Sequence, residues 1–154
     1  KLTFTELATL LLGDAKQAKS FMSKAKLHSM EELEDSWWNL YEKLLSTGRA
    51  VELSLKIELE DFLYNVQKLI HNKNLSTDEN LTGDVSIDTS AFDDSQCIGD
   101  WCAHFNSTWK NHKLVGMDIG TDSLVLMVLS NEEFKRAQEL AKELLHRIDV
   151  AERL

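Results

Sequence analysis

The sequence contains no proline, only six glycines and only two cysteines among its 154 residues. Without proline there is no ring to interrupt a helix, so long helices are permitted. Cys97 and Cys102 are too few to form the disulfide framework of a small secreted domain, and we therefore expect a cytoplasmic protein. No hydrophobic run approaches the about 20 residues that span a bilayer, so we expect no membrane partner.

Basic residues are also missing from one long segment. Residues 74–109 contain no Lys or Arg but carry seven carboxylates: Asp78, Glu79, Asp84, Asp88, Asp93, Asp94 and Asp100. Elsewhere 19 acidic residues face 17 basic ones, so most of the formal net charge of -9 comes from this segment. Such a surface repels nucleic acid, whose phosphates need Lys and Arg as partners, and attracts a basic protein or a cation. We therefore expect no nucleic-acid partner.

The rest of the composition is typical of an ordinary folded domain. The chain is 43% hydrophobic and 28% charged, which argues against global disorder. Its length lies near that of a typical domain. We expect one domain over residues 1–154, with an acidic loop near residues 74–97.

Helix starts are indicated at four places where a Ser, Thr or Asp precedes a Glu or Gln by three residues, as in a capping box. These pairs are Thr3–Glu6, Asp14–Gln17, Ser29–Glu32 and Ser130–Glu133. An apolar period of 3.6 residues follows each pair, and the last stripe extends from Phe134 to Ile148. The same period predicts helices over residues 59–70 and from Cys97 onwards, the second with Asp94 as its cap.

The apolar period changes to two residues after Gly48, which predicts a half-buried strand over residues 50–57. Residues 113–119 and 124–129 flank a Gly-Thr-Asp-Ser turn typical of a hairpin. The second run is apolar at every position, as in a strand buried on both faces. We predict an α+β fold: a three-stranded, mostly antiparallel sheet with residues 124–129 in its centre, packed with five to six helices.

Residues 78–89 share part of the pattern of a calcium-binding EF-hand loop. Oxygen-bearing side chains stand at loop positions 1, 3 and 5, and a glycine at position 6: Asp78, Asn80, Thr82 and Gly83. Position 12 is Thr89 and not the bidentate Glu that completes such a site, so an acidic surface loop is the simpler interpretation. A metal-binding or small-ligand domain that uses this loop remains an alternative.

No motif in the sequence predicts an enzyme. Met117–Ser123 resembles the phosphate-binding D-x-G-T turn of actin-like sugar kinases over four residues, but a hairpin turn explains it as well. Cys97, Cys102 and His104 do not have the spacing of zinc ligands, and we expect Cys102 to be a buried, unreactive thiol. We expect no enzymatic activity and no cofactor. An enzyme that gathers metal ions with loop carboxylates is the less favoured class.

Two adjacent tryptophans occur in the helix predicted after Ser29. Trp37 lies on the apolar stripe of that helix, and Trp38 is rotated by about 100° from it. One of the two is therefore expected in the core and the other at its edge or exposed. Exposed tryptophan is enriched among the residues that contribute most to protein interfaces, so Trp38 is a candidate contact residue.

The segments WWNLYEKLLSTGRAVELSLKIELEDF and MDIGTDSLVLMVL look like parts of a bacterial domain family of unassigned function. In size, acidity and α+β character the chain also resembles bacterial immunity proteins that neutralise contact-dependent growth-inhibition toxins. This resemblance implies a cognate, basic toxin of the nuclease type, whose active site an acidic surface would occlude. The residues expected in that contact are Asp84, Asp88, Asp93, Asp94, Asp100, Trp101, Trp109 and Trp38.

An interaction domain outside any toxin system is the other alternative. All these hypotheses for the acidic segment share one requirement. Its carboxylates must form a contiguous outward surface and must not be neutralised by the chain's own lysines and arginines.

Overall fold

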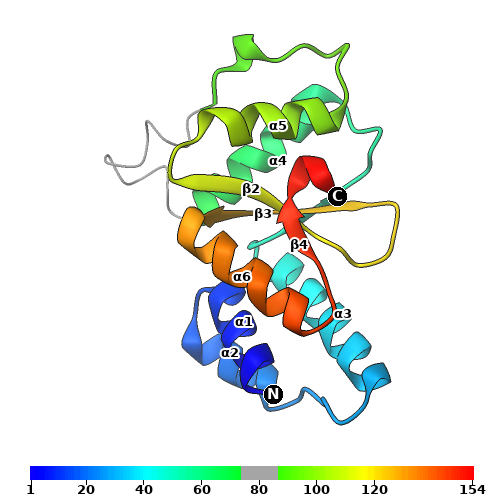
Figure 1. Cartoon of the computed structure of the whole chain (residues 1–154). Helices are drawn as coiled ribbons and strands as arrows, with labels where there is room; N and C mark the ends of the chain where they lie inside the picture. Colours follow the sequence, from blue (N-terminus) through cyan, green and yellow to red (C-terminus); the bar gives the residue numbers. More distant parts are fainter. Residues whose placement is uncertain (74–86) are drawn as a thin grey trace.

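The structure, a computed structural model, describes residues 1–73 and 87–154 (Figure 1). The helices are α1 (Leu2–Leu12), α2 (Ala15–Met22), α3 (Met30–Ser46), α4 (Leu59–Asn72), α5 (Ile98–Thr108) and α6 (Asn131–Glu143), with short 3-10 turns η2 (Thr89–Ala91) and η3 (Ala151–Arg153). The strands are β1 (Val51–Leu53), β2 (His112–Met117), β3 (Leu124–Ser130) and β4 (Ile148–Val150). No helix in these two ranges is long and apolar enough to cross a membrane.

The four strands form one antiparallel sheet in the order β1-β3-β2-β4. β3 lies between β1 and β2, and its first six residues are buried, which confirms the prediction of a central strand. The predicted α+β fold is confirmed, whereas the predicted strand count of three is wrong because β4 pairs with the other edge of β2. β1 is also shorter than the predicted strand over residues 50–57.

The missed strand β4 follows a helix that ends earlier than its apolar stripe. Leu145 has a φ of 61°, and the backbone N–H of His146 donates to the carbonyl of Ala141 at 2.8 Å, as in a Schellman ending. The chain then leaves the helix, and Ile148 pairs with Met117 of β2. Helical spacing alone could not show this change. Ile148 is buried in β4, just as it would be on the inner face of a longer helix.

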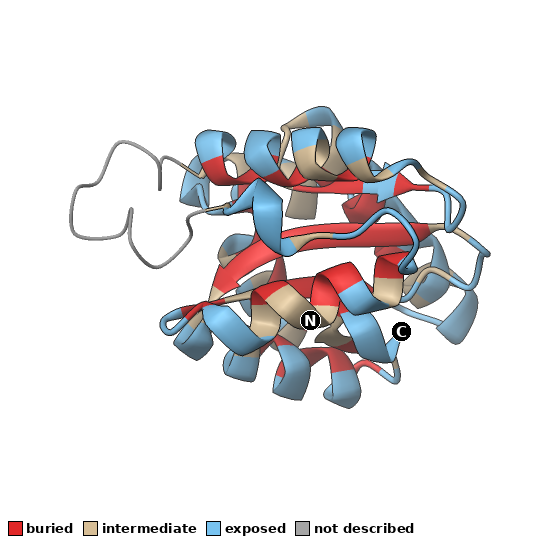
Figure 2. Ribbon diagram, turned by 90° about the horizontal axis from the view of Figure 1, so that it is seen from above, coloured by how far each residue is buried: buried red, intermediate tan, exposed pale blue. Residues whose placement is uncertain are grey.

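Helices cover both faces of the sheet and create two separate cores (Figures 1 and 2). On one face α1, α3 and α6 pack against the alternate β3 residues Val125, Met127 and Leu129. On the other face α4 and α5 pack against Leu126 and Val128, together with the first residue of β3. The sheet is therefore a partition, and surfaces built on α3 and on α5 lie on opposite sides of it.

Three of the four predicted caps are present, and one of them is a full capping box at the start of α6. Ser130 accepts a hydrogen bond from the backbone N–H of Glu133 at 3.1 Å, and Glu133 accepts one from that of Ser130 at 2.8 Å. Asp14 and Ser29 cap α2 and α3. The Thr3–Glu6 prediction is wrong, because α1 already begins at Leu2.

Replacement of Ser130 by alanine should lower the free energy of unfolding by about 1 kcal/mol, because the N–H of Glu133 loses its acceptor. Urea unfolding measures this change. Thr9→Ala, which removes a side-chain hydrogen bond inside α1, is the control and should change stability by less than the Ser130 variant. Equal stability of the Ser130 variant and the parent chain would contradict a role for the capping box.

Candidate functional site

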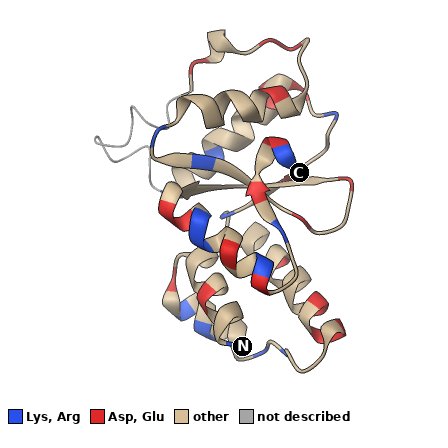
Figure 3. Ribbon diagram, viewed as in Figure 1, with Lys and Arg blue, Asp and Glu red and all other residues tan. Residues whose placement is uncertain are grey.

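Four carboxylates of the segment that lacks basic residues lie on one part of the molecule, which we call the acidic surface: Asp88, Asp93, Asp94 and Asp100. All four are exposed. They belong to the stretch that leads through η2 into the first turn of α5, and Figure 3 shows acidic positions along that stretch and at the start of the helix. The fifth predicted aspartate, Asp84, lies outside the described residues, as does most of the 78–89 loop.

Local hydrogen bonds order two of these carboxylates, Asp88 and Asp93. Asp88 accepts from the hydroxyl of Ser90 at 2.6 Å and from its backbone N–H at 3.1 Å, and these bonds hold the pKa of Asp88 below its ordinary value. Asp93 accepts from the backbone N–H of Ser95 at 2.9 Å, which likewise lowers the pKa of Asp93. Both groups are therefore fully ionised at neutral pH.

Asp100 has a structural role at the start of α5. Its carboxylate accepts a hydrogen bond from the backbone N–H of Cys97 at 3.3 Å, so Cys97 is the N-cap residue of this helix. The prediction that Asp94 caps α5 is wrong. Asp100 also lies in the first turn, where the helix dipole favours a negative charge.

The ion pairs between residues in the two described ranges leave the acidic surface uninvolved. They join Lys73 to Glu133, Arg136 to Glu6 and Glu139, His146 to Glu34, and Arg147 to Asp149. Among residues 1–73 and 87–154, therefore, no lysine or arginine forms an ion pair with any of the four aspartates. In the same two ranges, no group of three or more His, Cys, Asp and Glu is placed to hold a metal ion.

Trp101 and Trp109 are part of the core beneath the acidic surface and not of its outer face. Each is only 4% exposed, which leaves almost no ring surface for a partner and corrects their assignment as contact anchors. Trp101 donates its indole N–H to the carbonyl of Asp93 at 2.9 Å, so it fastens the acidic stretch to α5. Trp109 packs against Phe105 with 4.8 Å between ring centroids.

Trp38 is exposed to 41%, but it lies on α3, across the sheet from α5. The structure therefore does not bring it together with the acidic surface in one contact. Its neighbour Trp37 is 2% exposed, so the tryptophan pair divides into one core and one surface residue.

The two cysteines differ in their exposure. Cys102 is buried, as predicted, and burial raises the pKa of its thiol to about 12. Cys97 is exposed at the start of α5. His104 packs edge-on against Phe92, with 4.8 Å between the ring centroids.

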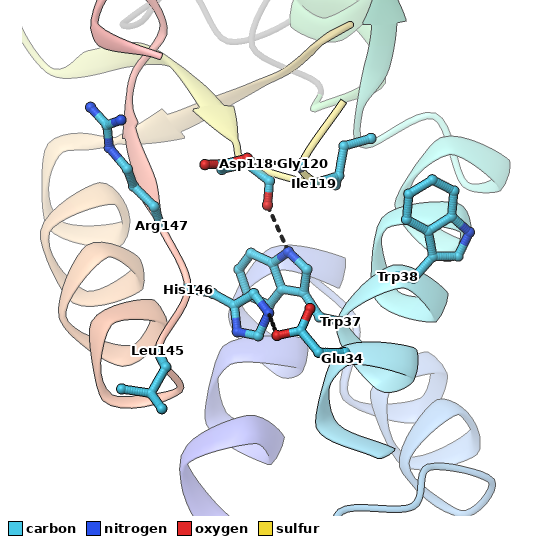
Figure 4. Close-up of a pocket in the computed structure, with 9 residues that line it drawn as sticks. All are labelled: Glu34, Trp37, Trp38, Asp118, Ile119, Gly120, Leu145, His146 and Arg147. Atoms are coloured by element: carbon cyan, nitrogen blue, oxygen red, sulfur yellow. Dashed lines mark hydrogen bonds and ion pairs between the residues drawn. The ribbon is translucent and has the colours of Figure 1, made fainter. Parts of the chain in front are cut away.

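A cavity that the sequence did not indicate lies between α3, the β2–β3 turn and the α6–β4 turn (Figure 4). We call it the indole cavity. Its volume is about 360 Å³, and it is lined by Glu34, Trp37, Trp38, Asp118, Ile119, Gly120, Leu145, His146 and Arg147.

Trp37 and His146 form the floor of the indole cavity. Their rings are stacked with 4.3 Å between centroids and 21° between planes. Trp37 donates its indole N–H to the carbonyl of Asp118 at 2.8 Å, which fixes the β2–β3 turn against α3. Glu34 stands over the imidazole, with one carboxylate oxygen 2.9 Å from Nε2 of His146. The lining residues come from three distant parts of the sequence, so no local motif could have indicated them.

Fold and surface together define an α+β protein with an antiparallel sheet between two helical layers, an acidic surface on one side and a polar, aromatic cavity on the other. The chain belongs to the DUF6630 family, a domain of unknown function whose family model matches residues 3–151. No curated protein and no solved structure matches the chain significantly.

Proposed function

We propose that the protein is an immunity protein that binds a basic toxin through the acidic surface and blocks its active site. The observation that carries this proposal is the display of four exposed carboxylates without an ion pair to any described lysine or arginine. The likeness to immunity proteins in size, acidity and fold class gives further support. The family match names no function and leaves the partner open.

The physical basis of the proposed inhibition is complementary charge. A nuclease binds phosphate with Lys and Arg, so its active-site cleft attracts a protein surface that offers several fixed carboxylates. Because Asp88 and Asp93 are held by hydrogen bonds to their own backbone stretch, they are presented in a fixed arrangement and lose little conformational freedom on binding. Charge attraction of this kind mainly increases the association rate and weakens with added salt.

The test uses the combined variant Asp88→Asn, Asp93→Asn, Asp100→Asn. Asparagine retains an oxygen that can accept the local hydrogen bonds, so the variant removes charge and not the turn structure. The partner is the basic C-terminal domain of a large secreted protein, if one is encoded directly beside this gene. We expect the association rate to fall by about tenfold or more at low salt, and protection of growth against that domain to be lost.

The matched control, Glu31→Gln, Asp35→Asn, Glu42→Gln, removes three exposed charges from α3 on the far side of the sheet. It should retain protection and association within about twofold. Unchanged protection by the aspartate variant would remove the acidic surface from the mechanism. A neighbouring domain that is toxic but neither binds the chain nor is neutralised by it would refute the immunity role.

A further inference from the structure

A second cavity lies between α3 and the end of α2 with the turn that follows it, and we call it the α2–α3 groove. Its volume is about 510 Å³. The α3 side of the lining consists of Asn39, Glu42, Lys43 and Ser46, whose spacing of three and four residues places them on one outward stripe of the helix. Leu40 and the other core residues of α3 lie on a different side of it, so the groove is open to solvent over the outside of that core.

The groove lies in the part of the chain where lysines are most concentrated. Residues 15–30 contain no Asp or Glu and carry four exposed lysines: Lys16, Lys19, Lys24 and Lys26. Figure 3 shows basic positions on α2. Lys24 belongs to the lining together with Lys43 of α3, and Glu42 is the only acid among the described lining residues. The groove therefore carries a net positive charge in a chain whose formal net charge is -9.

Four donor side chains of the lining have no partner within the protein. Lys24 and Lys43 take part in none of the ion pairs between residues 1–73 and 87–154. The side chains of Ser20 and Asn39 form no hydrogen bond within the same two ranges, although both residues line the groove. Lys43 is half-buried, so its alkyl stem lies against the protein while its ammonium group remains available to a ligand.

This set of donors matches a phosphate monoester better than a carboxylate. At pH 7.5 a phosphate monoester carries a charge of about -2 and three terminal oxygens that accept hydrogen bonds. A carboxylate carries a single charge and two oxygens. Two ammonium groups with a hydroxyl and an amide beside them can balance the larger charge and donate to all three oxygens.

An apolar part of the lining suits an aromatic body attached to the phosphate. Phe21 and Ala25 form this part, next to the two lysines. The ring of Phe21 is half-buried and stacks with the core residue Phe4, with 6.1 Å between centroids and 14° between planes. Phe21 is therefore held in place by the core and offers a fixed apolar surface to a ligand ring. The volume of the groove lies within the range of about 300–1,000 Å³ that is usual for small-molecule sites.

We propose that the α2–α3 groove binds a phosphate monoester of an aromatic alcohol, with Lys24 and Lys43 at the phosphate and Phe21 against the ring. The site is independent of the proposed immunity function, because the groove lies on the side of the sheet covered by α1, α3 and α6, whereas the acidic surface lies on the side covered by α4 and α5. The aromatic phosphate can belong to a free small molecule or to a phosphotyrosine side chain of another protein.

The test is a titration with phenyl phosphate at pH 7.5 and constant ionic strength, followed in ¹H–¹⁵N NMR spectra through the backbone signals of Ser20 and Lys43 and the side-chain amide of Asn39. We expect saturable shifts of these signals. The pair Lys24→Gln, Lys43→Gln should weaken the binding by about tenfold or more, since it removes both charged donors. Glu42→Gln removes the opposing charge and should tighten the binding by about two- to threefold.

The matched control is the pair Lys16→Gln, Lys26→Gln, which removes the same charge from exposed positions of the same segment outside the lining. It should weaken the binding by less than about threefold, because these charges act only through solvent. Methyl phosphate, which lacks the ring, should bind several-fold more weakly than phenyl phosphate. Shifts that do not saturate, equal affinities for the two phosphates, or equal losses in the two lysine pairs would each overturn the proposal.

The peptide acetyl-Gly-phosphotyrosyl-Gly-amide distinguishes the two sources of the ligand. An affinity for the peptide at least equal to that for phenyl phosphate assigns the aromatic phosphate to a protein. A lower affinity assigns it to a free small molecule, since the peptide backbone then does not fit beside the groove.

Discussion

Replacement of Trp37 by alanine is expected to lower the free energy of unfolding by about 3–5 kcal/mol. The ring is 2% exposed and lies in the core formed by α1, α3 and α6. Its loss removes a large apolar surface and leaves a void that the surrounding helices can fill only in part. Because small proteins are stable by only about 5–15 kcal/mol, this change alone removes a large share of the total.

Trp37 also connects α3 to two distant parts of the chain. Its indole N–H binds the carbonyl of Asp118 in the β2–β3 turn, and its face packs on His146 after α6. Trp37→Phe keeps most of the ring but removes the hydrogen bond, so we expect an intermediate loss of about 1–2 kcal/mol. The order parent, Phe variant, Ala variant should appear in urea unfolding at constant pH.

The adjacent residue provides the matched control for this prediction. Trp38 has the same side chain on the same helix but is 41% exposed, and its main ring contact is an edge-on approach to Tyr41 at 4.9 Å. Trp38→Ala should therefore cost about 1 kcal/mol or less. Similar losses for Trp37→Ala and Trp38→Ala would show that the burial difference between the two rings does not determine stability here.

The sequence predicted the central strand and the start of α6 correctly. The apolar run at residues 124–129 identified the central strand, and Ser130 with Glu133 identified the start of α6. β4 was missed because Ile148 continues the helical spacing of α6. The helix ends at Leu145, whose backbone is left-handed. A glycine at this position would have indicated the end of the helix in the sequence, but a leucine does not.

For the acidic surface, composition predicted the negative charge but not which neighbouring aromatic side chains would be buried. The spacing that placed Cys102 on a buried helix face applied equally to Trp101, which the structure buries in the same core. Trp101 was nevertheless assigned to a contact because carboxylates surround it in sequence. Helical spacing was the better guide to burial, since a helix separates neighbours in sequence onto opposite faces.

The indole cavity could not be predicted, because its chemistry arises only from tertiary packing. Glu34, Asp118 and His146 each look like an ordinary helix or turn residue when considered alone. These three residues come close together because α6 ends early and because a hydrogen bond holds the β2–β3 turn to Trp37. Convergence of polar groups from distant segments is typical of binding pockets and leaves no pattern along the chain.

The sheet separates the indole cavity from the acidic surface, so their effects should be independent. The residues of the two sites belong to different cores, and changes at sites this well separated are usually additive. A variant of Glu34 should therefore leave toxin protection unchanged.

The second large effect is expected at Phe105, in the core below the acidic surface. Phe105→Ala should lower the free energy of unfolding by about 3–5 kcal/mol. The ring is 1% exposed and is the centre of an aromatic cluster, with centroid distances of 6.1 Å to Phe62, 4.9 Å to Phe92 and 4.8 Å to Trp109. Truncation removes all three contacts and opens a void between α4 and α5.

Phe105→Ala also tests how the acidic stretch is held in place, because it disturbs the packing of that stretch without changing its charge. Phe92 belongs to that stretch and packs on Phe105, so its ring loses its support while the four aspartates stay unchanged. We expect faster hydrogen exchange in α5 and in residues 87–97 than in α1 or α6 under native conditions. Ser107→Ala on the exposed face of α5 is the control and should change stability by less than about 0.5 kcal/mol. A uniform increase in exchange over both helical layers would show instead that the two cores open together.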